Sequence, residues 1–202
     1  MARTPKVVED RREQIIDAAM RVFAQKGFTR ATNKDIAREA GITAGLIYHY
    51  FESKEAVLKA IIDTRSPLKV VKSMPEQALA LAPEVFLRLL VGQILGIVES
   101  DDFVRLLRVF LPEVIHNPEV SPLGVSVLQE AIQFLAGYLA NKMASGELRT
   151  TDAALAAQAL MGSMIGFVLR RQILRDEWAL SYSHEQIVDA VISTALEGLL
   201  PR

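Results

Sequence analysis

The side chains best suited to bind a partner lie near the amino end, within the segment Thr29–Lys54. The segment reads TRATNKDIAREAGITAGLIYHYFESK, and it places two short apolar patterns on either side of Gly41. Two short helices that meet over a glycine turn are typical of the helix-turn-helix unit, whose second helix lies in the major groove of DNA. We therefore expect these residues to bind a duplex through hydrogen bonds and charge.

The local pattern predicts where each short helix begins and ends. Thr32 has the chemistry of an N-cap, and Asp35 three residues later completes an acidic variant of the capping box. Gly41 suits the left-handed turn after the first helix. Thr43 and Ser53 are expected to cap the helices that follow. The three helices are predicted at Asn33–Ala40, Ala44–Phe51 and Lys54–Arg65.

The start of the second helix carries few side chains that can read bases. Ala44, Gly45 and Leu46 offer no bidentate donor to guanine or adenine. Gly45 permits a close approach of the backbone, and Ala44 or Leu46 can meet a thymine methyl group. Lys34 and Arg38, on the preceding helix, can add contacts to phosphates or base edges. The pattern favours phosphate contacts and shape readout, and it does not specify an operator sequence.

A second interpretation of the amino-terminal segment stays open. The same spacing fits a generic corner between two helices that bind no DNA. Four cations, Arg3, Lys6, Arg11 and Arg12, can form an arm toward the DNA backbone or minor groove, or simply a solvated tail. Residues 1–60 contain 11 Lys and Arg against 8 Asp and Glu, whereas residues 61–202 contain 12 against 16. This asymmetry suits DNA binding at one end, although many proteins that bind no DNA show as much.

A longer set of residues resembles the N-terminal domain of the tetracycline-repressor (TetR/AcrR) family of transcriptional regulators. The resemblance covers about residues 10–60 without a gap. It rests on Ala18-Ala19, Phe23, Gly27-Phe28, Thr32, Asp35-Ile36-Ala37, Ala40-Gly41, Gly45, Ile47-Tyr48-His49-Tyr50-Phe51 and Ser53-Lys54-Glu55. It implies a helical DNA-binding domain that acts as a pair within a dimer.

Carried over residue by residue, the resemblance implies that Thr32, Thr43, Tyr48 and Lys54 contact DNA phosphates. The two threonines can act as helix caps as well, and Tyr48 can alternatively be a half-buried core aromatic. Lys54 lies at a helix N-terminus, where a cation is disfavoured unless an anion such as a phosphate is near. His49 lies opposite the core side of its helix, where it can contact a base or phosphate or remain a solvated surface histidine.

The apolar periodicity along the chain is helical, so we expect an all-α fold. Residues 9–52 would form a three-helix helix-turn-helix domain, with a first helix over Glu9–Lys26, and residues 53–66 a connecting helix. Residues 67–202 would form a larger helical domain for ligand binding and dimerisation. Its helices are expected at Glu76–Glu99, which Pro83 can kink or split, and at Asp101–His116, Ser121–Ala144, Asp152–Leu174 and His184–Leu200.

The charge-free stretch Ala153–Leu169 marks a candidate dimer interface. Its Gly162-Ser-Met-Ile-Gly166 motif can pair helices in membranes, but a span needs about 20 apolar residues, so we expect no membrane insertion. Two such helices from each subunit would form a four-helix interface; a core within one domain is the alternative. The expected interface residues are Ala159, Gly162, Ser163, Gly166, Val188, Val191, Ile192 and Ala195.

The middle helices hold most of the remaining aromatic side chains, with a few polar ones between them. A helical domain with apolar walls can enclose a small molecule, although phenylalanines at helical spacing equally fit an ordinary core. The candidate pocket residues are Phe103, Arg105, Phe110, Glu113, Phe134, Tyr138, Met164 and Phe167.

Composition and motifs exclude several kinds of chemistry. The chain has 202 residues, no cysteine and a net charge of −1, so disulfides, thiolate zinc sites and cysteine nucleophiles are excluded. Its three histidines lack metal-ligand spacing, and no phosphate loop, HExxH or Gly-x-Ser-x-Gly motif occurs. We expect no enzyme activity, metal or cofactor. The amino end lacks the apolar run of a secretory signal, and a cytoplasmic location is expected.

Together these features predict a homodimeric, ligand-responsive transcriptional regulator, most simply a repressor of a pseudo-palindromic double-stranded DNA operator. A small, largely apolar effector in the second domain would favour a spacing of the recognition helices that no longer matches one DNA turn. The helix Lys54–Arg65 would carry the movement. Two alternatives stay open: a DNA-binding architectural protein without a ligand, and a helical enzyme or carrier whose front only mimics the motif.

Overall fold

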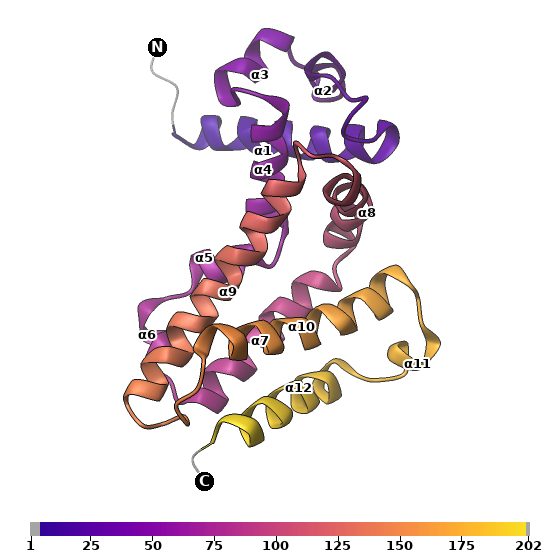
Figure 1. Cartoon of the computed structure of the whole chain (residues 1–202). Coiled ribbons are helices and arrows are strands. Elements are labelled where there is room, and N and C mark those ends of the chain that lie inside the picture. Colours follow the sequence, from indigo (N-terminus) through magenta and orange to yellow (C-terminus); the bar gives the residue numbers. More distant parts are fainter. Residues whose placement is uncertain (1–4, 201–202) are drawn as a thin grey trace. The chain divides into compact units, whose positions relative to one another are not determined.

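The computed structural model describes residues 5–200, with side chains from Asp10 onward, and every regular element in that range is a helix (Figure 1). The predicted all-α fold is therefore confirmed for the described residues. Of the cations considered for an amino-terminal arm, Arg3 and the side chain of Lys6 lie outside this description. The chain forms two compact units. The first joins the residues up to Ser66 to Arg105–Gly124, and the second combines Pro67–Val104 with the chain from Val125 onward.

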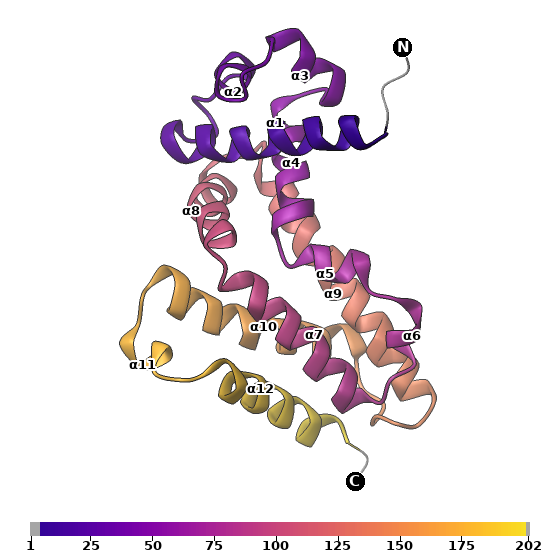
Figure 2. The same cartoon turned by 180° about the vertical axis from the view of Figure 1, so that it is seen from behind.

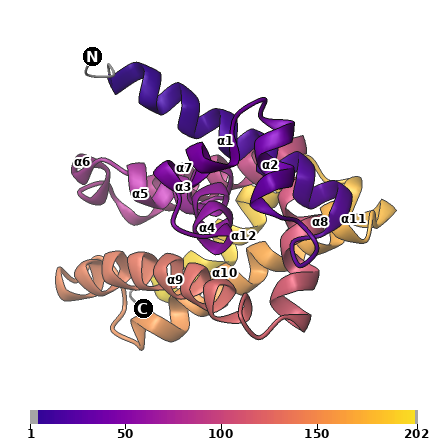
Figure 3. The same cartoon turned by 90° about the horizontal axis from the view of Figure 1, so that it is seen from above.

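Four helices from the amino end build most of the first unit (Figures 1 and 3). These are α1 (Pro5–Lys26), α2 (Asn33–Glu39), α3 (Ala44–Tyr50) and α4 (Lys54–Arg65). Helix α1 packs against α2 and α4, and α2 packs against α3. The predicted apolar face of α1 is buried: Ile15 and Ile16 are fully enclosed, and the Phe23 ring meets the Phe28 ring edge-on. This packing fixes the platform on which α3 rests.

Two helices are shared between the units. Helix α8 (Asp101–His116) begins in the second unit and continues into the first, and α9 (Ser121–Ala144) does the reverse. The expected limit between residues 66 and 67 is thus one of three points at which the chain passes between units. The other two lie inside helices, where no turn signal marks them.

The remaining helices belong to the second unit (Figure 2). They are α5 (Leu68–Ser73), α6 (Glu76–Leu79), α7 (Pro83–Val98), α10 (Ala153–Val168), α11 (Glu177–Leu180) and α12 (His184–Leu199). Helix α12 packs against both α7 and α10. Tyr138 of α9 stacks on Phe86 of α7 with 3.7 Å between the ring centroids. Both rings are buried, so they tie α9 to α7 within the core of this unit.

Local breaks in the second unit differ in part from the expectation. One break was foreseen: the helix predicted over Glu76–Glu99 is split at Pro83, which occupies the first turn of α7, where its missing N–H costs little. The helix predicted to reach Leu174 changes after Val168 into a π-helical turn, Leu169–Ile173. Helices α5 and α11 were not predicted, since six and four residues are too short to display a periodic pattern.

Two segments, α9 and α10 with its π-helical turn, are long and apolar enough to cross a membrane by length and composition alone. In each, 17% of the tested window is buried inside the structure. Core helices of proteins that never enter a membrane pass the same test, so the finding marks apolar helices and no more.

Candidate nucleic-acid interface

Helix α3 turns one face into the first unit and the other toward solvent. Ile47 is fully buried, whereas Tyr48 is 61% exposed. Thr43, Gly45 and His49 also lie at the surface. The exposure of Tyr48 speaks against the core role considered above, and it leaves the phenolic hydroxyl accessible to a partner.

The start of α3 is open at the surface. Thr43 occupies the N-cap position but makes no side-chain cap hydrogen bond, contrary to expectation. Apart from its chain neighbours and the backbone of its own helix, no atom lies within 4 Å of the position that a Cβ on Gly45 would take. Ala44 and Leu46 are partly exposed beside it. A duplex can therefore approach the first turn of α3 closely, and the Thr43 hydroxyl is not committed to the helix.

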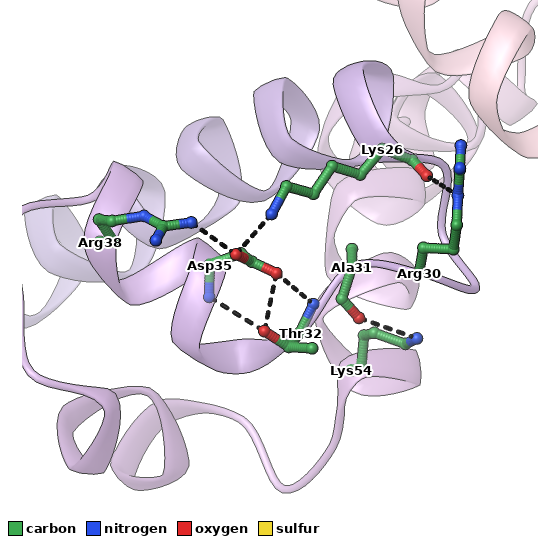
Figure 4. Close-up of polar contacts among 7 residues, drawn as sticks. All are labelled: Lys26, Arg30, Ala31, Thr32, Asp35, Arg38 and Lys54. Atoms are coloured by element: carbon green, nitrogen blue, oxygen red, sulfur yellow. Dashed lines mark hydrogen bonds and ion pairs between the residues drawn. The ribbon is translucent and has the colours of Figure 1, made fainter.

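The start of α2 carries the predicted capping box in full (Figure 4). Thr32 Oγ1 accepts a hydrogen bond from Asp35 N, and Asp35 Oδ2 accepts one from Thr32 N, each at 3.2 Å. Asp35 Oδ1 also pairs with Lys26 and Arg38, each at 2.6 Å. The hydrogen bonds from Lys26 and Thr32 lower the pKa of Asp35 to about 2. One carboxylate thus fixes the start of α2 and gathers two cations beside it.

The surface of α2 retains positive charge in spite of this pairing. The Arg38 side chain is 76% exposed, so most of its guanidinium donors face solvent. Lys34 is exposed on the same helix, as is Thr32 at its start. Lys34 and Arg38 are therefore accessible, and their contact with phosphates stays a prediction. The Thr32 hydroxyl instead donates to Asp35 Oδ2 at 2.8 Å, which leaves it no hydrogen for a phosphate.

Lys54, at the start of α4, is directed toward the loop that joins α1 and α2. Its Nζ donates hydrogen bonds to the carbonyl oxygens of Phe28 at 2.8 Å and of Thr29 at 3.2 Å. It also donates to the Ala31 carbonyl at 3.2 Å, the contact drawn in Figure 4. The ammonium also lies 4.4 Å from the centroid of the Phe28 ring, a cation–π geometry. An ammonium has three N–H donors, so this set leaves none for the phosphate that the resemblance implies.

Glu113 of α8 reaches the same loop within the first unit. Its carboxylate accepts hydrogen bonds from Thr29 N at 3.3 Å and from Thr29 Oγ1 at 3.0 Å. Asn117 Nδ2 donates to it at 3.3 Å. Partial burial acts to raise the pKa of Glu113, but the hydrogen bonds from Thr29 and Asn117 outweigh burial and lower the pKa overall. Glu113 was predicted as a pocket residue, whereas the structure gives its carboxylate a role in holding a loop.

The other predicted pocket residues are divided between the two units. Arg105 and Phe110 lie in the first unit with Glu113, and the second unit holds Phe103, Phe134, Tyr138, Met164 and Phe167. Phe134 and Tyr138 are brought together around Phe86, with 6.4 Å between the Phe134 and Phe86 centroids. The Tyr138 hydroxyl donates to the Leu81 carbonyl at 2.9 Å, and burial raises the pKa of Tyr138 to about 12. This tyrosine is a satisfied core residue.

An apolar groove of about 430 Å³ runs between α10 and α12. It is lined by Ala156, Ala159, Leu160, Ser163, Phe167, Ala190, Val191, Thr194, Ala195, Gly198 and Leu199. Four predicted interface residues, Ala159, Ser163, Val191 and Ala195, therefore share one surface. Gly162 and Gly166 are exposed with open space at their Cβ positions. Val188 and Ile192 do not line the groove. Like Val191, which lines it, they are buried in their own unit.

Sequence reasoning missed Thr29 and part of the groove. No local signal identifies Thr29, because its partner Glu113 is 84 residues away. The small residues Ala190, Thr194 and Gly198 recur every four positions on α12, and this spacing could have placed them on one face.

Comparison with known proteins covers both parts of the chain. The model "Bacterial regulatory proteins, tetR family" matches residues 15–61, and the model "AefR-like transcriptional repressor, C-terminal domain" matches residues 86–198. The HTH-type transcriptional regulator HbdR of Aromatoleum sp. (strain CIB) is 47% identical over 64 residues, which are 30% of this chain and 28% of HbdR. The aligned part thus spans less than a third of that relative.

Solved structures resemble the chain over nearly its whole length. The transcriptional regulator FadR from Bacillus subtilis, in complex with stearoyl-CoA, has a TM-score of 0.72 and 24% identity, covering 92% of this chain and 98% of FadR. The SmeT–triclosan complex has a TM-score of 0.76 and 21% identity, covering 95% and 92%. At these identities the likeness establishes a shared fold. Since the second family model alone matches more than half of the chain, this protein belongs to the TetR family of bacterial regulatory proteins.

Proposed function

We propose that this protein is a DNA-binding transcriptional regulator, specifically a repressor, whose hold on its operator is tuned by a small, largely apolar ligand. The observation that carries the proposal is the solvent-facing side of α3, where Thr43, Tyr48 and His49 are exposed together on a helix-turn-helix support. A helix presented in this way fits the major groove. Such a regulator acts in the cytoplasm, where chromosomal DNA lies.

The proposed DNA contacts fall into two groups. Thr43 and Tyr48 would donate hydrogen bonds to phosphates, and Lys34 and Arg38 would add charge to the same backbone. The Thr32 hydroxyl already donates its one hydrogen to Asp35 Oδ2 at 2.8 Å, so Thr32 is left out of this group. Ala44, Gly45, Leu46 and His49 would lie along the base edges. Because the second group has few bidentate donors, we expect discrimination between sequences to depend strongly on DNA shape.

The groove between α10 and α12 supports a homodimer. Ala159, Gly162 and Ser163 leave room for a second helix to approach closely, and Leu155 on the same helix is 67% exposed. A second copy of these two helices would cover the groove and form a four-helix interface. The pair would present two α3 helices to a pseudo-palindromic operator with half-sites in successive major grooves.

The proposed effector site lies in the second unit. Phe103, Phe134 and Met164 supply its apolar walls in this proposal. Support comes from two proteins of the same fold, one in complex with stearoyl-CoA and one with triclosan; both ligands carry large apolar parts. A ligand lowers DNA affinity only by binding better to the shape that cannot hold DNA.

Selection of bound DNA tests this function directly. The purified protein is incubated with genomic fragments and bulk competitor at moderate ionic strength, and the retained fragments are sequenced. We expect a shared inverted repeat. The selected fragment is then titrated again with stearoyl-CoA or triclosan present. Failure to enrich any duplex would overturn DNA recognition. Enrichment that neither compound weakens would favour the ligand-independent architectural protein.

A further inference from the structure

The loop between α1 and α2, residues Gly27–Ala31, is held by two oppositely charged side chains from distant parts of the chain. Lys54 comes from the first turn of α4, and Glu113 comes from α8. Both lie in the first unit. The Lys54 ammonium donates hydrogen bonds to backbone carbonyl oxygens of the loop. The Glu113 carboxylate accepts hydrogen bonds from a backbone N–H and a side-chain hydroxyl of the loop.

All three N–H donors of the Lys54 ammonium form hydrogen bonds with this loop. The three carbonyl oxygens that it reaches, on Phe28, Thr29 and Ala31, lie at 2.8, 3.2 and 3.2 Å. These contacts also explain how a cation is tolerated at a helix N-terminus: the loop carbonyls supply the negative partner. Ser53 independently caps α4 by accepting a hydrogen bond from Ala56 N at 3.1 Å. A phosphate is therefore not needed to account for either feature.

Glu113 holds the same loop by accepting hydrogen bonds from the donors of the loop. Its two hydrogen bonds from Thr29 fix one peptide N–H and one hydroxyl of the loop. Glu113 Oε1 also lies 3.9 Å from the place of a Cβ on Gly27, which has a positive φ of 76°. That backbone conformation favours glycine and lets the chain turn sharply out of α1.

The position of this loop determines where α2 begins. The residue after the loop, Thr32, is the N-cap of α2 and anchors the capping box with Asp35. Helix α2 packs against α3. A shift of the loop would therefore move the start of α2 and, through α2, the helix α3 that is proposed to enter the major groove of DNA.

We infer that Lys54 and Glu113 are positioning residues for DNA recognition, which orient the helix-turn-helix through the α1–α2 loop and do not contact DNA themselves. This inference rests on the proposed DNA-binding function. It separates Lys54 from the phosphate contacts, and it gives Thr29 a role that no local pattern predicts.

Variants of the two charged residues test the inference. Lys54→Met keeps the apolar stem over Phe28 and removes the three donors. Binding is measured to a duplex that the wild-type protein selects and to a scrambled duplex, across a salt series and well below each variant's unfolding midpoint. We expect the selected duplex to bind roughly ten- to a hundredfold more weakly, the range of one hydrogen bond to a charged group. Scrambled-duplex affinity and the salt slope should stay unchanged.

Two results would overturn the role of Lys54. Equal losses on both duplexes, with a salt slope smaller by about one unit, would establish a phosphate contact. A lower unfolding midpoint with unchanged affinity for both duplexes would establish a role in stability alone. If the wild-type protein selects no duplex at all, the proposed function fails before any variant is compared, so the two failures are distinguishable.

A double-mutant cycle tests Glu113 through its partner. Thr29→Val removes only the hydroxyl, and Glu113→Ala removes the carboxylate. We expect each to weaken binding to the selected duplex and the double variant to be less impaired than the two single losses combined. Glu113→Gln, which retains an acceptor, should recover part of the affinity. Fully additive losses, or no loss, would refute the contact's role. Glu119→Gln, a change to an exposed carboxylate in the same unit, is the matched control and should change nothing.

Discussion

Lys26 at the end of α1 pairs with Asp35 in the first turn of α2, with 2.6 Å between Nζ and Oδ1. The same carboxylate closes the capping box with Thr32 and pairs with Arg38. It therefore serves as the hub that joins α1, the start of α2 and the charged surface of α2. Hydrogen bonds from Lys26 and Thr32 hold its pKa at about 2, well below the ordinary value of 3.8.

This depressed pKa predicts how acid affects the fold. Because the folded-state pKa lies below the unfolded one, ionised Asp35 stabilises the protein above the ordinary pKa, and the contribution is lost as the pH falls from about 5 toward 2. Asp35→Asn should lower the thermal unfolding midpoint at pH 7, and the gap to the wild type should narrow as the pH approaches 3. Glu52→Gln, an exposed change in the same unit, is the control. A gap that stays constant from pH 7 to pH 3 would contradict the assignment.

Two nearby tyrosines in α3 should differ in how loss of the hydroxyl affects DNA affinity: Tyr48 should need its hydroxyl and Tyr50 should not. Tyr48 is 61% exposed, so Tyr48→Phe should leave the unfolding free energy unchanged and weaken DNA binding roughly ten- to a hundredfold, the range of one hydrogen bond to a charged phosphate. Fluorescence anisotropy with a selected duplex measures the affinity. Equal affinity of Tyr48→Phe and the wild type would remove this residue from the interface.

Tyr50 is the internal comparison. Its hydroxyl is buried without a hydrogen-bond partner among the described residues, and such a group costs free energy on folding. Tyr50→Phe should therefore leave the unfolding free energy unchanged or raise it by up to about 1 kcal/mol, with DNA affinity retained. Urea unfolding checks the first expectation. A clear loss of stability would show that the hydroxyl has a partner in solution.

The features predicted correctly from the sequence are those encoded within a few residues. The capping box needs only Thr32 and Asp35, and the outward face of α3 follows from helical spacing around Ile47. The signal for each lies within one or two turns, where side chain and backbone chemistry decide the outcome with little tertiary influence.

The partners of charged residues could not be predicted in the same way. Lys54 reaches carbonyls 23 to 26 residues away, and Glu113 reaches Thr29 across 84 residues. A cation or carboxylate on a helix has no sequence pattern that names its partner, so both were assigned by analogy or composition. The points inside α8 and α9 at which the chain passes from one unit to the other could not be predicted either, because a continuous helix carries no turn residue at such a point.

Lys142 of α9 illustrates a buried charge with a structural role. It is 7% exposed, and its Nζ lies 3.0 and 3.2 Å from the two carboxylate oxygens of Glu147 and 3.4 Å from the Ala80 carbonyl. Lys142→Met fills similar space but removes these contacts, so we expect the unfolding free energy to fall by roughly 1–2 kcal/mol. Chemical denaturation measures the change. Glu147→Gln should cost less, because the Ala80 contact remains; a larger loss for Glu147→Gln would reverse this ranking of the contacts.

Gly162 tests the proposed dimer face. Apart from its chain neighbours and the backbone of its own helix, nothing lies within 4 Å of its Cβ position. Gly162→Leu should therefore not disturb the fold of a single subunit, and leucine is the better helix former by about 0.5–1 kcal/mol. The added side chain would, however, occupy the space that a second α10 needs for close approach. We expect light scattering to report the monomer mass, with helicity by circular dichroism unchanged. Gly96→Leu is the matched control, since Gly96 of α7 is also exposed with open space around it. A dimer that persists in Gly162→Leu with intact helicity would place the interface elsewhere, and loss of the dimer in both variants would show that neither effect is specific to the groove between α10 and α12.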